Sequence, residues 1–473
     1  MDLTNVIKPL LISGAEVLPL VEGGKGIAIS DGVSSGAWAA EGGIGTFSAV
    51  NAHTPGEGYL CVPGAYSSRT RLKRHAEMIE RAISGGVAQA KIAYETACGR
   101  GRIHMNVLWE MGGVDAVLHG ILSKVKNMIH GVTCGAGMPF RLAEICAKYN
   151  VKYYPIVSSA RAFNILWKRA YSRVSDWLGG VVYEDPWLAG GHNGLSTNED
   201  ENVPEPHEPR VRSLRELMRS YGISDLIPIF VAGGVWHLNE WENFIGNPEF
   251  GAIAFQFGTR PLLTVESPIP MAWKKSLFSR KKGDVELNRF SPTGFPSSAV
   301  NNVFLRKMQA RLKRQVSFTK VADGVCTEAF PLTGSGSGTS NREVFVKKED
   351  IPNINAWRNE GFVVPLVTPS KTLVFVSEDD LAEIERDRRQ CVGCLSACKF
   401  SGWNQEESAQ IIEPDPRLFC IQNSLQQIVI TGDVENALMF CGHEGYRFAE
   451  DPFYEGGYIP SVKELVARIR TGY

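Results

Sequence analysis

A single histidine, His192, lies in a glycine-rich stretch that reads Ala-Gly-Gly-His-Asn-Gly at residues 189–194. Glycine lets a backbone approach a flat or anionic ligand closely. An imidazole in such a setting is a candidate acid or base beside a bound cofactor. The same residues also fit an ordinary loop histidine after a turn, so both interpretations stay open at this position.

A second group of chemically active residues is a cysteine cluster near the C-terminus. Cys391, Cys394 and Cys398 follow the spacing C-x2-C-x3-C, and Cys420 and Cys441 lie downstream. Three thiolates this close can hold three corners of a [4Fe-4S] cluster, which a distant fourth cysteine completes. Four thiolates also satisfy a tetrahedral zinc site. We predict a cluster bound by Cys391, Cys394, Cys398 and Cys420, with zinc as the alternative metal and Cys441 as the alternative fourth ligand.

Glycine-rich turns mark three further places where a ligand could approach the backbone. The residues concerned are Gly23, Gly24 and Gly26; Gly233 and Gly234; and Gly258, which Thr259 follows. Lys25, within the first turn, either supplies a cation to a ligand or points outward. In many α/β barrels the ends of the last two strands bind phosphate through backbone N–H groups, so the two later turns are the strongest candidates for a phosphate site.

Apolar segments and helical stretches alternate through the first 260 residues and would place these turns at strand ends. Strands are expected near 44–48, 103–108, 152–157, 181–183, 227–231 and 253–257, and helices near 69–97, 114–129, 140–149, 160–172 and 212–221. An acidic, proline-rich insert at 198–209 is expected on the surface, with His207 solvated. The length of 473 residues suits a barrel of roughly 250 residues with an appendage.

The motifs AGGHNG, IPIFVAGGV (227–235) and GAIAFQFGTRPLLTVES (251–267) together resemble the nitronate monooxygenase family, formerly called 2-nitropropane dioxygenases. The resemblance spans roughly residues 8–270. It implies an α/β fold, a (β/α)8 TIM barrel that binds FMN, here with a C-terminal α-rich extension that carries the cysteine cluster. Relatives in this group include FMN-dependent enoyl reductases and NADH:quinone reductases.

The resemblance also implies roles for particular residues. His192 would be the catalytic base, and the FMN contacts would come from Gly23, Gly24, Gly26, Asn106, Glu184, Gly190, Gly191, Gly233, Gly234, Gln256, Gly258 and Thr259. Glu184 stands one residue farther from the AGGH turn than is usual in the family. The cysteine segment is similar to the [4Fe-4S] motif of dienoyl-CoA reductases, which implies a cluster that passes single electrons to the flavin.

Composition limits the partners and the compartment. The formal net charge of −1 argues against a protein-wide field for nucleic acid or membrane, and no apolar run reaches the roughly 18–20 residues of a membrane helix. Ten cysteines with three bunched together favour a reducing compartment, so we expect a cytoplasmic protein. Its expected partners are a small-molecule substrate and an electron donor protein or NAD(P)H, in a chain that could form a homodimer.

Three segments are expected: a barrel at 1–270, a basic connecting segment at 271–345 and a cysteine-cluster region at 346–473. We interpret the chain as an FMN oxidoreductase that oxidises a small nitronate-like carbanion with O2. The alternatives are a flavin and iron–sulfur reductase of an enoyl thioester or quinone, and an RNA-directed flavoprotein whose basic segment docks the nucleic acid.

Overall fold

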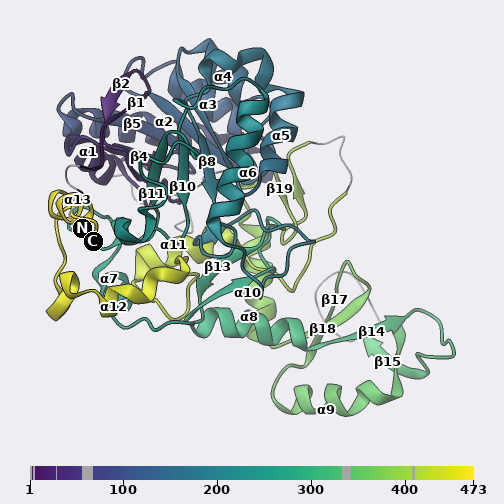
Figure 1. The fold of residues 1–473 in the computed structure, drawn as a ribbon. Coiled ribbons are helices and arrows are strands. Elements are labelled where there is room, and N and C mark those ends of the chain that lie inside the picture. The colour runs from purple at the N-terminus through teal and green to yellow at the C-terminus, as the bar shows by residue number, and fades with distance from the viewer. Residues whose placement is uncertain are drawn as a thin grey trace.

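The computed structural model describes residues 3, 6–27, 29–55, 66, 68–332, 342–406 and 411–473. The chain begins with a closed barrel of parallel strands in the spatial order β10-β11-β3-β4-β5-β6-β7-β8 (Figure 1). These strands are β3 (Leu20–Glu22), β4 (Ile44–Ser48), β5 (Arg102–Leu108), β6 (Gly131–Gly135), β7 (Lys152–Val157), β8 (Val181–Glu184), β10 (Ile229–Ala232) and β11 (Ile253–Phe257). The predicted TIM barrel is therefore confirmed.

Helices connect the strands and cover the outside of the barrel. They are α1 (Gly32–Ala40), α2 (Arg71–Ala97), α3 (Val114–Leu122), α4 (Leu142–Lys148), α5 (Ala160–Arg169) and α6 (His207–Ser220). Short 3-10 helices, Leu238–Trp241 and Arg260–Leu262, follow the last two strands. Every residue of β4, β6 and β11 is buried, because the strands are covered on one face by helices and on the other by the barrel interior.

A hairpin of β1 (Leu10–Ile12) and β2 (Ala15–Val17) precedes the first barrel strand. Its Ser13 hydroxyl lies 2.6 Å from the Tyr154 hydroxyl and 3.0 Å from His104 Nε2. Ile12 and Val17 join the apolar residues inside the barrel. The hairpin thus occupies the end of the barrel at which the strands begin, which leaves the opposite end for the candidate site.

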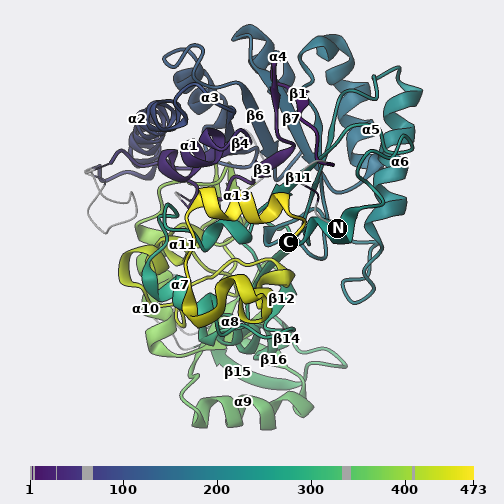
Figure 2. The ribbon, with the colours of Figure 1, turned by 60° about the vertical axis from the view of Figure 1, so that its left-hand side comes forward.

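The C-terminal extension lies against the end of the barrel at which the strands finish (Figures 1 and 2). It contains α7 (Met271–Leu277), β12 (Val285–Asn288), β13 (Ser297–Val300), α8 (Val303–Lys313), α10 (Glu378–Arg389), β19 (Ala397–Cys398), β20 (Trp403–Asn404), α11 (Ile421–Thr431), α12 (Arg447–Glu450) and α13 (Val462–Arg470). The last helix, α13, returns to pack against α1 of the barrel. The extension is therefore part of the same packed body as the barrel.

A small antiparallel sheet projects from the extension and has an apolar cluster of its own. Its strands, in the order β15-β16-β14-β18-β17, are β14 (Gln315–Thr319), β15 (Glu328–Leu332), β16 (Arg342–Val346), β17 (Val364–Val367) and β18 (Thr372–Val376), and α9 (Ile351–Asn359) packs beside them. The expected boundary at residue 345 falls within β16, so this sheet draws on both segments that the sequence separated.

Several basic side chains of the connecting segment have internal partners. Lys274 donates to the Thr264 carbonyl oxygen at 2.6 Å, and Arg311 donates to Asp380 at 3.0 Å. The Arg314 guanidinium lies 3.5 Å from the centre of the Phe362 ring. These three charges are used to hold the extension together, which weakens the interpretation of the segment as an RNA-docking surface. Among the described helices, none is long and apolar enough to cross a membrane.

Candidate active site

His192 is held in place by strand pairing between the barrel and the extension. After β8 the chain turns and forms the two-residue strand β9 (Gly191–His192). This strand pairs with β13, with His192 opposite Ser297 and Gly191 opposite Ser298. The backbone of the histidine is therefore fixed by a segment about a hundred residues later in the chain.

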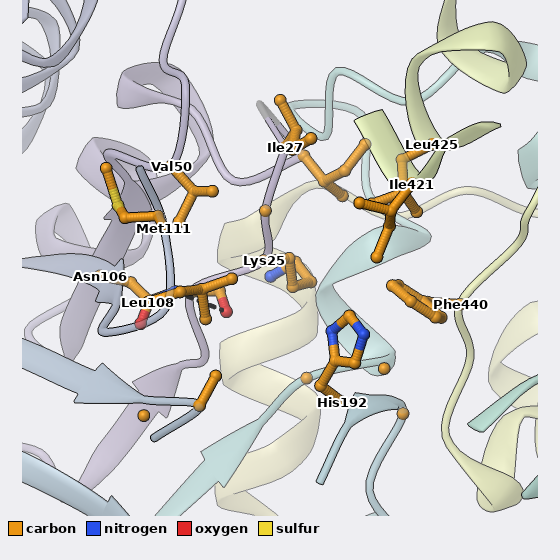
Figure 3. A pocket seen from close by; sticks show the side chains of 18 of the residues that line it. Lys25, Ile27, Val50, Asn106, Leu108, Met111, His192, Ile421, Leu425 and Phe440 are labelled. Carbon is orange, nitrogen blue, oxygen red and sulfur yellow. Dashed lines mark hydrogen bonds between the residues drawn. The ribbon is translucent and has the colours of Figure 1, made fainter. Parts of the chain in front are cut away.

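The imidazole of His192 is partly exposed and lines a large cavity at the end of the barrel (Figure 3). Its Nε2 lies 2.7 Å from the Ser291 hydroxyl, and its ring meets the Phe440 ring edge-on at 5.3 Å between centroids. Burial lowers the pKa of His192 to about 4, because the charged ring would lose its hydration. The ring is therefore neutral near pH 7.

We call this space the central cavity. Counted together with its open mouth, it holds about 1410 Å³ of space between atoms. Of the sequence-predicted residues, it is lined by Gly24, Gly26, Asn106, Glu184, Gly190, Gly191, His192, Gln256, Gly258 and Thr259.

A smaller space, the glycine cavity, adjoins it and is lined by Gly23, Gly24, Glu184, Gly190, Gly233, Gly234, Gln256, Gly258 and Thr259. All of the predicted cofactor residues thus line at least one of two adjoining cavities. Of these residues, Gly24, Glu184, Gly190, Gln256, Gly258 and Thr259 line both.

The first glycine turn follows β3 and runs directly past the end of β5. A side-chain carbon added to Gly24 would lie 2.3 Å from Asn106 Cβ, so only glycine fits there. The Asn106 amide donates to the Gly24 carbonyl at 3.4 Å and accepts a hydrogen bond from Thr133 at 3.2 Å. Asn106 therefore stays at the cavity wall, where an amide can offer both a donor and an acceptor.

Lys25 points into the protein rather than outward. Its ammonium donates to the Gly23 carbonyl at 2.7 Å and to Glu22 at 3.3 Å, and the residue lines both cavities. Burial lowers the pKa of Lys25 and raises that of Glu22, while their mutual attraction opposes both shifts. Oxygen Oε2 of Glu22 is buried and has no hydrogen-bond partner among the described residues. This arrangement places a lysine–glutamate pair beside the cavities.

The glycine cavity lies at the ends of the last two strands of the barrel. Gly233 and Gly234 follow β10 with φ of +84° and +77°, a backbone conformation that glycine adopts without strain. A side-chain carbon added to Gly258 would meet no atom within 4 Å, so the space next to it is open. Open space beside glycine backbone at strand ends is what an anionic group such as a phosphate requires.

One neighbour of this cavity differs from the prediction. We expected His207 to be solvated in the acidic insert, but α6 begins at this residue and its ring is largely enclosed. His207 Nε2 lies 3.0 Å from the Gly233 carbonyl oxygen, and its ring meets Trp241 edge-on at 4.7 Å. The apolar and polar contacts together outweigh its hydration, so His207 buttresses the glycine turn.

Glu184 lies where both cavities meet, at the end of β8. Burial, with a smaller contribution from the neighbouring carboxylate of Asp185, raises the pKa of Glu184 to about 8. A carboxylic acid with this pKa is mostly protonated near pH 7 and can donate a hydrogen bond. Although its spacing from the AGGH turn is unusual, Glu184 lies on the wall of both cavities.

Part of the cavity wall comes from residues that the sequence analysis missed. The extension contributes Trp273, Thr293, Leu395, Ile421, Gln422, Leu425, Phe440 and Gly442, together with Cys394 and Cys441, which were expected only as metal ligands. Residues 439–442 run beside β13, with bonds from Val300 N–H to the Met439 carbonyl and from Gly442 N–H to Thr259. No local motif marks these positions, because their role follows from long-range pairing.

Gly190 lies against this covering segment. A side-chain carbon on Gly190 would lie 2.5 Å from the carbonyl carbon of Cys441 and from the nitrogen of Gly442. The glycine thus allows the segment at 439–442, which we call the cover segment, to close over the cavity. The residue was predicted from a cofactor motif, and the structure adds this packing requirement.

The cysteine cluster surrounds a third space, the thiol cavity. Cys391, Cys394, Cys398 and Cys420 all line it, whereas Cys441 lines the central cavity instead. Arg74 of α2 donates to the Cys391 carbonyl at 3.0 Å, and Gly112 N–H donates to the Cys394 carbonyl at 2.9 Å. Within the described residues, no group of three or more His, Cys, Asp or Glu side chains is placed to hold a metal ion.

The thiol cavity and the central cavity share a wall. Cys394, Ile421 and Gln422 line both. Asn51, at the central cavity, donates its amide to Gln422 at 2.7 Å, and both side chains are almost fully buried. Because Cys394 itself lines both spaces, the thiol cavity directly adjoins the proposed cofactor space.

The barrel ends and their cavities fit FMN on three observations. There is open space beside Gly258, a turn at Gly24 with no room for a side chain, and an amide at Asn106 that reaches the cavity wall. Together they offer open space beside a glycine backbone for a phosphate and a larger adjoining cavity for a flat ring, as expected of a barrel whose last strands hold a phosphate.

Comparisons with known proteins agree with this arrangement. A family model described as nitronate monooxygenase matches residues 108–376, more than half of the chain. No curated protein sequence matches.

Among solved structures, the enoyl reductase domain of MlnA from the macrolactin biosynthesis cluster of Bacillus amyloliquefaciens has a TM-score of 0.53 at 14% identity, over 96% of this chain and 93% of that one. FabK from Thermotoga maritima has a TM-score of 0.49 at 15% identity, over 99% and 94%. At these identities the likeness to the MlnA domain bears on the fold alone. On the family match, the chain belongs to the nitronate monooxygenase family and is an FMN-dependent oxidoreductase.

Proposed function

We propose that the chain oxidises a small nitronate-like substrate with O2, with FMN bound across the central and glycine cavities. The observation that carries this proposal is the neutral imidazole of His192 on the wall of the central cavity. When bound, FMN would supply the electron transfer. The protein's own residues bind and orient the reactants, exclude water and hold the proton at His192.

The roles of the surrounding residues follow from their positions. Gly233, Gly234, Gly258 and Thr259 would hold the phosphate, and Asn106 and Glu184 would contact the ring. His192 has two available roles: a base that takes the carbon proton of a neutral nitro compound and so forms the nitronate, or a donor to an oxygen of the nitronate itself. An uncharged ring can play either role, and the two roles differ in whether the nitrogen that faces the substrate carries the proton.

The test is turnover of alkyl nitronates by the purified protein, followed by oxygen consumption with no NAD(P)H present. Oxygen uptake that depends on the nitronate supports the proposal. Flavin that stays oxidised with a panel of nitronates under argon, and no oxygen uptake in air, would exclude nitronates as substrates. Copurified flavin is measured in the same sample from its visible spectrum.

A second candidate function is favoured by the wall that the thiol and central cavities share. We propose that Cys391, Cys394, Cys398 and Cys420 hold a [4Fe-4S] cluster through which electrons enter a reductase of an enoyl thioester or quinone. The four thiols line one cavity, which supports a shared ligand, and bound metal would have to draw them closer than they lie. Zinc remains the alternative metal.

Purification without oxygen separates these cases. A brown protein with about four irons and four acid-labile sulfides per chain supports the cluster. Stoichiometric zinc without sulfide would replace it by a structural metal site. Anaerobic reduction of the flavin by NAD(P)H or by a reduced carrier protein would then support the reductase over the oxidase.

A further inference from the structure

Behind His192 runs a chain of hydroxyl groups that the proposed function does not use. Ser291 Oγ lies 2.7 Å from His192 Nε2 and 2.9 Å from Thr293 Oγ1. Thr293 Oγ1 also accepts a hydrogen bond from Phe295 N–H at 3.1 Å. Ser291 also accepts a hydrogen bond from Thr293 N–H at 3.4 Å and is only 2% exposed, so its partners are protein groups rather than bulk water.

The backbone N–H group of Phe295, at one end of this row of hydroxyl groups, indicates the direction in which its hydrogen bonds run. An amide N–H can only donate, so the hydroxyl of Thr293 accepts from Phe295 and has its own proton to give. If Thr293 donates to Ser291 and Ser291 donates to His192, both hydroxyl groups have an acceptor, and the donor left without one among the described residues is the ring N–H of His192. In the opposite direction the Thr293 proton has no acceptor among the described residues. The 2.7 Å contact also suits an O–H donor, since N–H donors usually lie at about 2.9–3.0 Å.

A neutral imidazole has one donor nitrogen and one acceptor nitrogen. If Nε2 accepts from Ser291, then Nδ1 carries the proton. Nδ1 has no hydrogen-bond partner among the described residues, and the ring lines the central cavity. A proton on Nδ1 would therefore be available to a ligand in that cavity.

We propose that Ser291, polarised by Thr293, is a positioning residue that holds His192 with its proton on Nδ1. The imidazole then donates a hydrogen bond to an oxygen of the substrate. The matching chemical class is a substrate whose reacting carbon is conjugated to an electron-rich oxygen, as in a nitronate, a thioester carbonyl or a quinone. The identity of the substrate rests on the proposed function, whereas the position of the proton does not.

The test is 15N NMR of protein labelled at histidine, in which the nitrogen shifts distinguish the two neutral forms of each ring. His192→Gln assigns the resonance. We expect a protonated Nδ1 and an unprotonated Nε2 in the native protein near pH 7. Ser291→Ala should move at least half of the population to the form protonated on Nε2, and Thr293→Val should move it in the same direction.

Ser298→Ala is the matched control. Ser298 is a buried hydroxyl on β13 that lies 3.1 Å from Nε2 of a different histidine, His443. The Ser298→Ala substitution should leave the His192 signals unchanged. A native protein with His192 protonated on Nε2, or a Ser291→Ala variant with unchanged nitrogen shifts, would overturn the proposal.

A second measurement addresses the donor role and separates it from substrate identity. Under argon, an alkyl nitronate added to the flavin-loaded protein should shift the Nδ1 proton of His192 downfield. Binding without such a shift would overturn the donor role. If no nitronate binds but Nδ1 is protonated, the oxidase proposal fails while the positioning role of Ser291 stands, and a quinone or an enoyl thioester becomes the next probe.

Discussion

At the scale of single residues, the site depends on a few atoms whose neighbours leave little choice. His192 is the clearest case, because its backbone is fixed by β13 and its ring by Ser291 and Phe440. Removing the ring should therefore change chemistry more than structure.

We expect His192→Ala to keep its flavin and to lose about 10²- to 10⁴-fold in kcat/KM, the usual contribution of a group that moves or positions a proton. His443→Ala is the control, since that histidine bonds Ser298 and is not part of the central cavity lining. Steady-state kinetics and the flavin spectrum measure both variants. A loss below about threefold, or a colourless His192→Ala protein, would place the residue among structural ones.

Gly258 offers a test of the phosphate site that does not disturb the fold. Because an added side-chain carbon there meets no protein atom within 4 Å, Gly258→Ala should fold and is the uncharged reference for flavin content. Gly258→Asp adds a negative charge to the same open space and should lose most of its FMN by electrostatic repulsion. Flavin content per chain after gel filtration is the measurement, and full occupancy in Gly258→Asp would show that the phosphate lies elsewhere.

Glu184 gives a prediction for the pH dependence of stability in flavin-free protein. Its pKa in the folded chain is about 8, against 4.5 for an unperturbed glutamate. As the pH rises, the unfolded chain loses this proton at a lower pH than the folded chain does. The contribution of Glu184 to stability is therefore full below pH 4.5 and is lost as the pH rises to about 8. The Glu184→Gln variant has no ionisable group at this position, so its stability should not fall over this pH range.

The expected difference between native protein and Glu184→Gln is a gain for the variant of up to a few kcal/mol near pH 8 and little near pH 5, since one pKa unit corresponds to about 1.4 kcal/mol. Urea unfolding at four pH values measures it. The exposed Glu216→Gln on α6 is the control and should follow the native curve. Parallel curves for Glu184→Gln and native protein would contradict the raised pKa.

At the scale of elements, the barrel could be predicted from the sequence because its strands and turns carry local signals. The strand before Glu184 and the glycine turns at Gly233 and Gly258 were expected where the structure has them. Their placement follows from apolar runs that end in glycine, and such runs can be recognised from a short window of sequence.

The cover segment could not be predicted in this way. Its placement follows from pairing of β9 with β13 and from the bridge between Ala299 and Phe440, which join residues far apart in the chain. The Ser291–Thr293 chain was missed for the same reason, since nothing local links it to His192. His207 was misjudged because an acidic, proline-rich sequence hides a helix start that packs against Trp241.

Gly190 connects the two kinds of element and yields a prediction. Gly190→Ala places a methyl group against the backbone of Cys441 and Gly442, so the cover segment must shift. We expect a loss of about 1–3 kcal/mol in unfolding free energy, typical of overpacking, and faster amide hydrogen exchange at residues 439–443. Gly258→Ala, which meets no neighbour, should exchange like the native protein. Unchanged exchange in Gly190→Ala would mean that the segment does not rest on this glycine.

At the scale of the whole molecule, the extension does two things at the same end of the barrel. It closes the central cavity with α11 and the cover segment (Figure 3), and it brings four cysteines to the adjoining thiol cavity. The anchors from Arg74 and from Gly112 tie the cysteine loop to the barrel itself. A redox centre in the thiol cavity would therefore keep a fixed separation from a flavin in the central cavity.

Because Cys420 and Cys441 lie in different cavities, the identity of the fourth ligand tests the proposed cluster. Cys420 lines the thiol cavity with the other three cysteines, whereas Cys441 lines the central cavity and packs in a separate apolar cluster. Purified without oxygen, Cys420→Ser should lose most of its iron and acid-labile sulfide, and Cys441→Ser should retain both. The flavin of Cys420→Ser should remain, because the two cavities bind separately, so loss of iron alone distinguishes a ligand change from misfolding. The reverse order, with Cys441→Ser the more damaging change, would require the cover segment to move toward the thiol cavity when metal is bound.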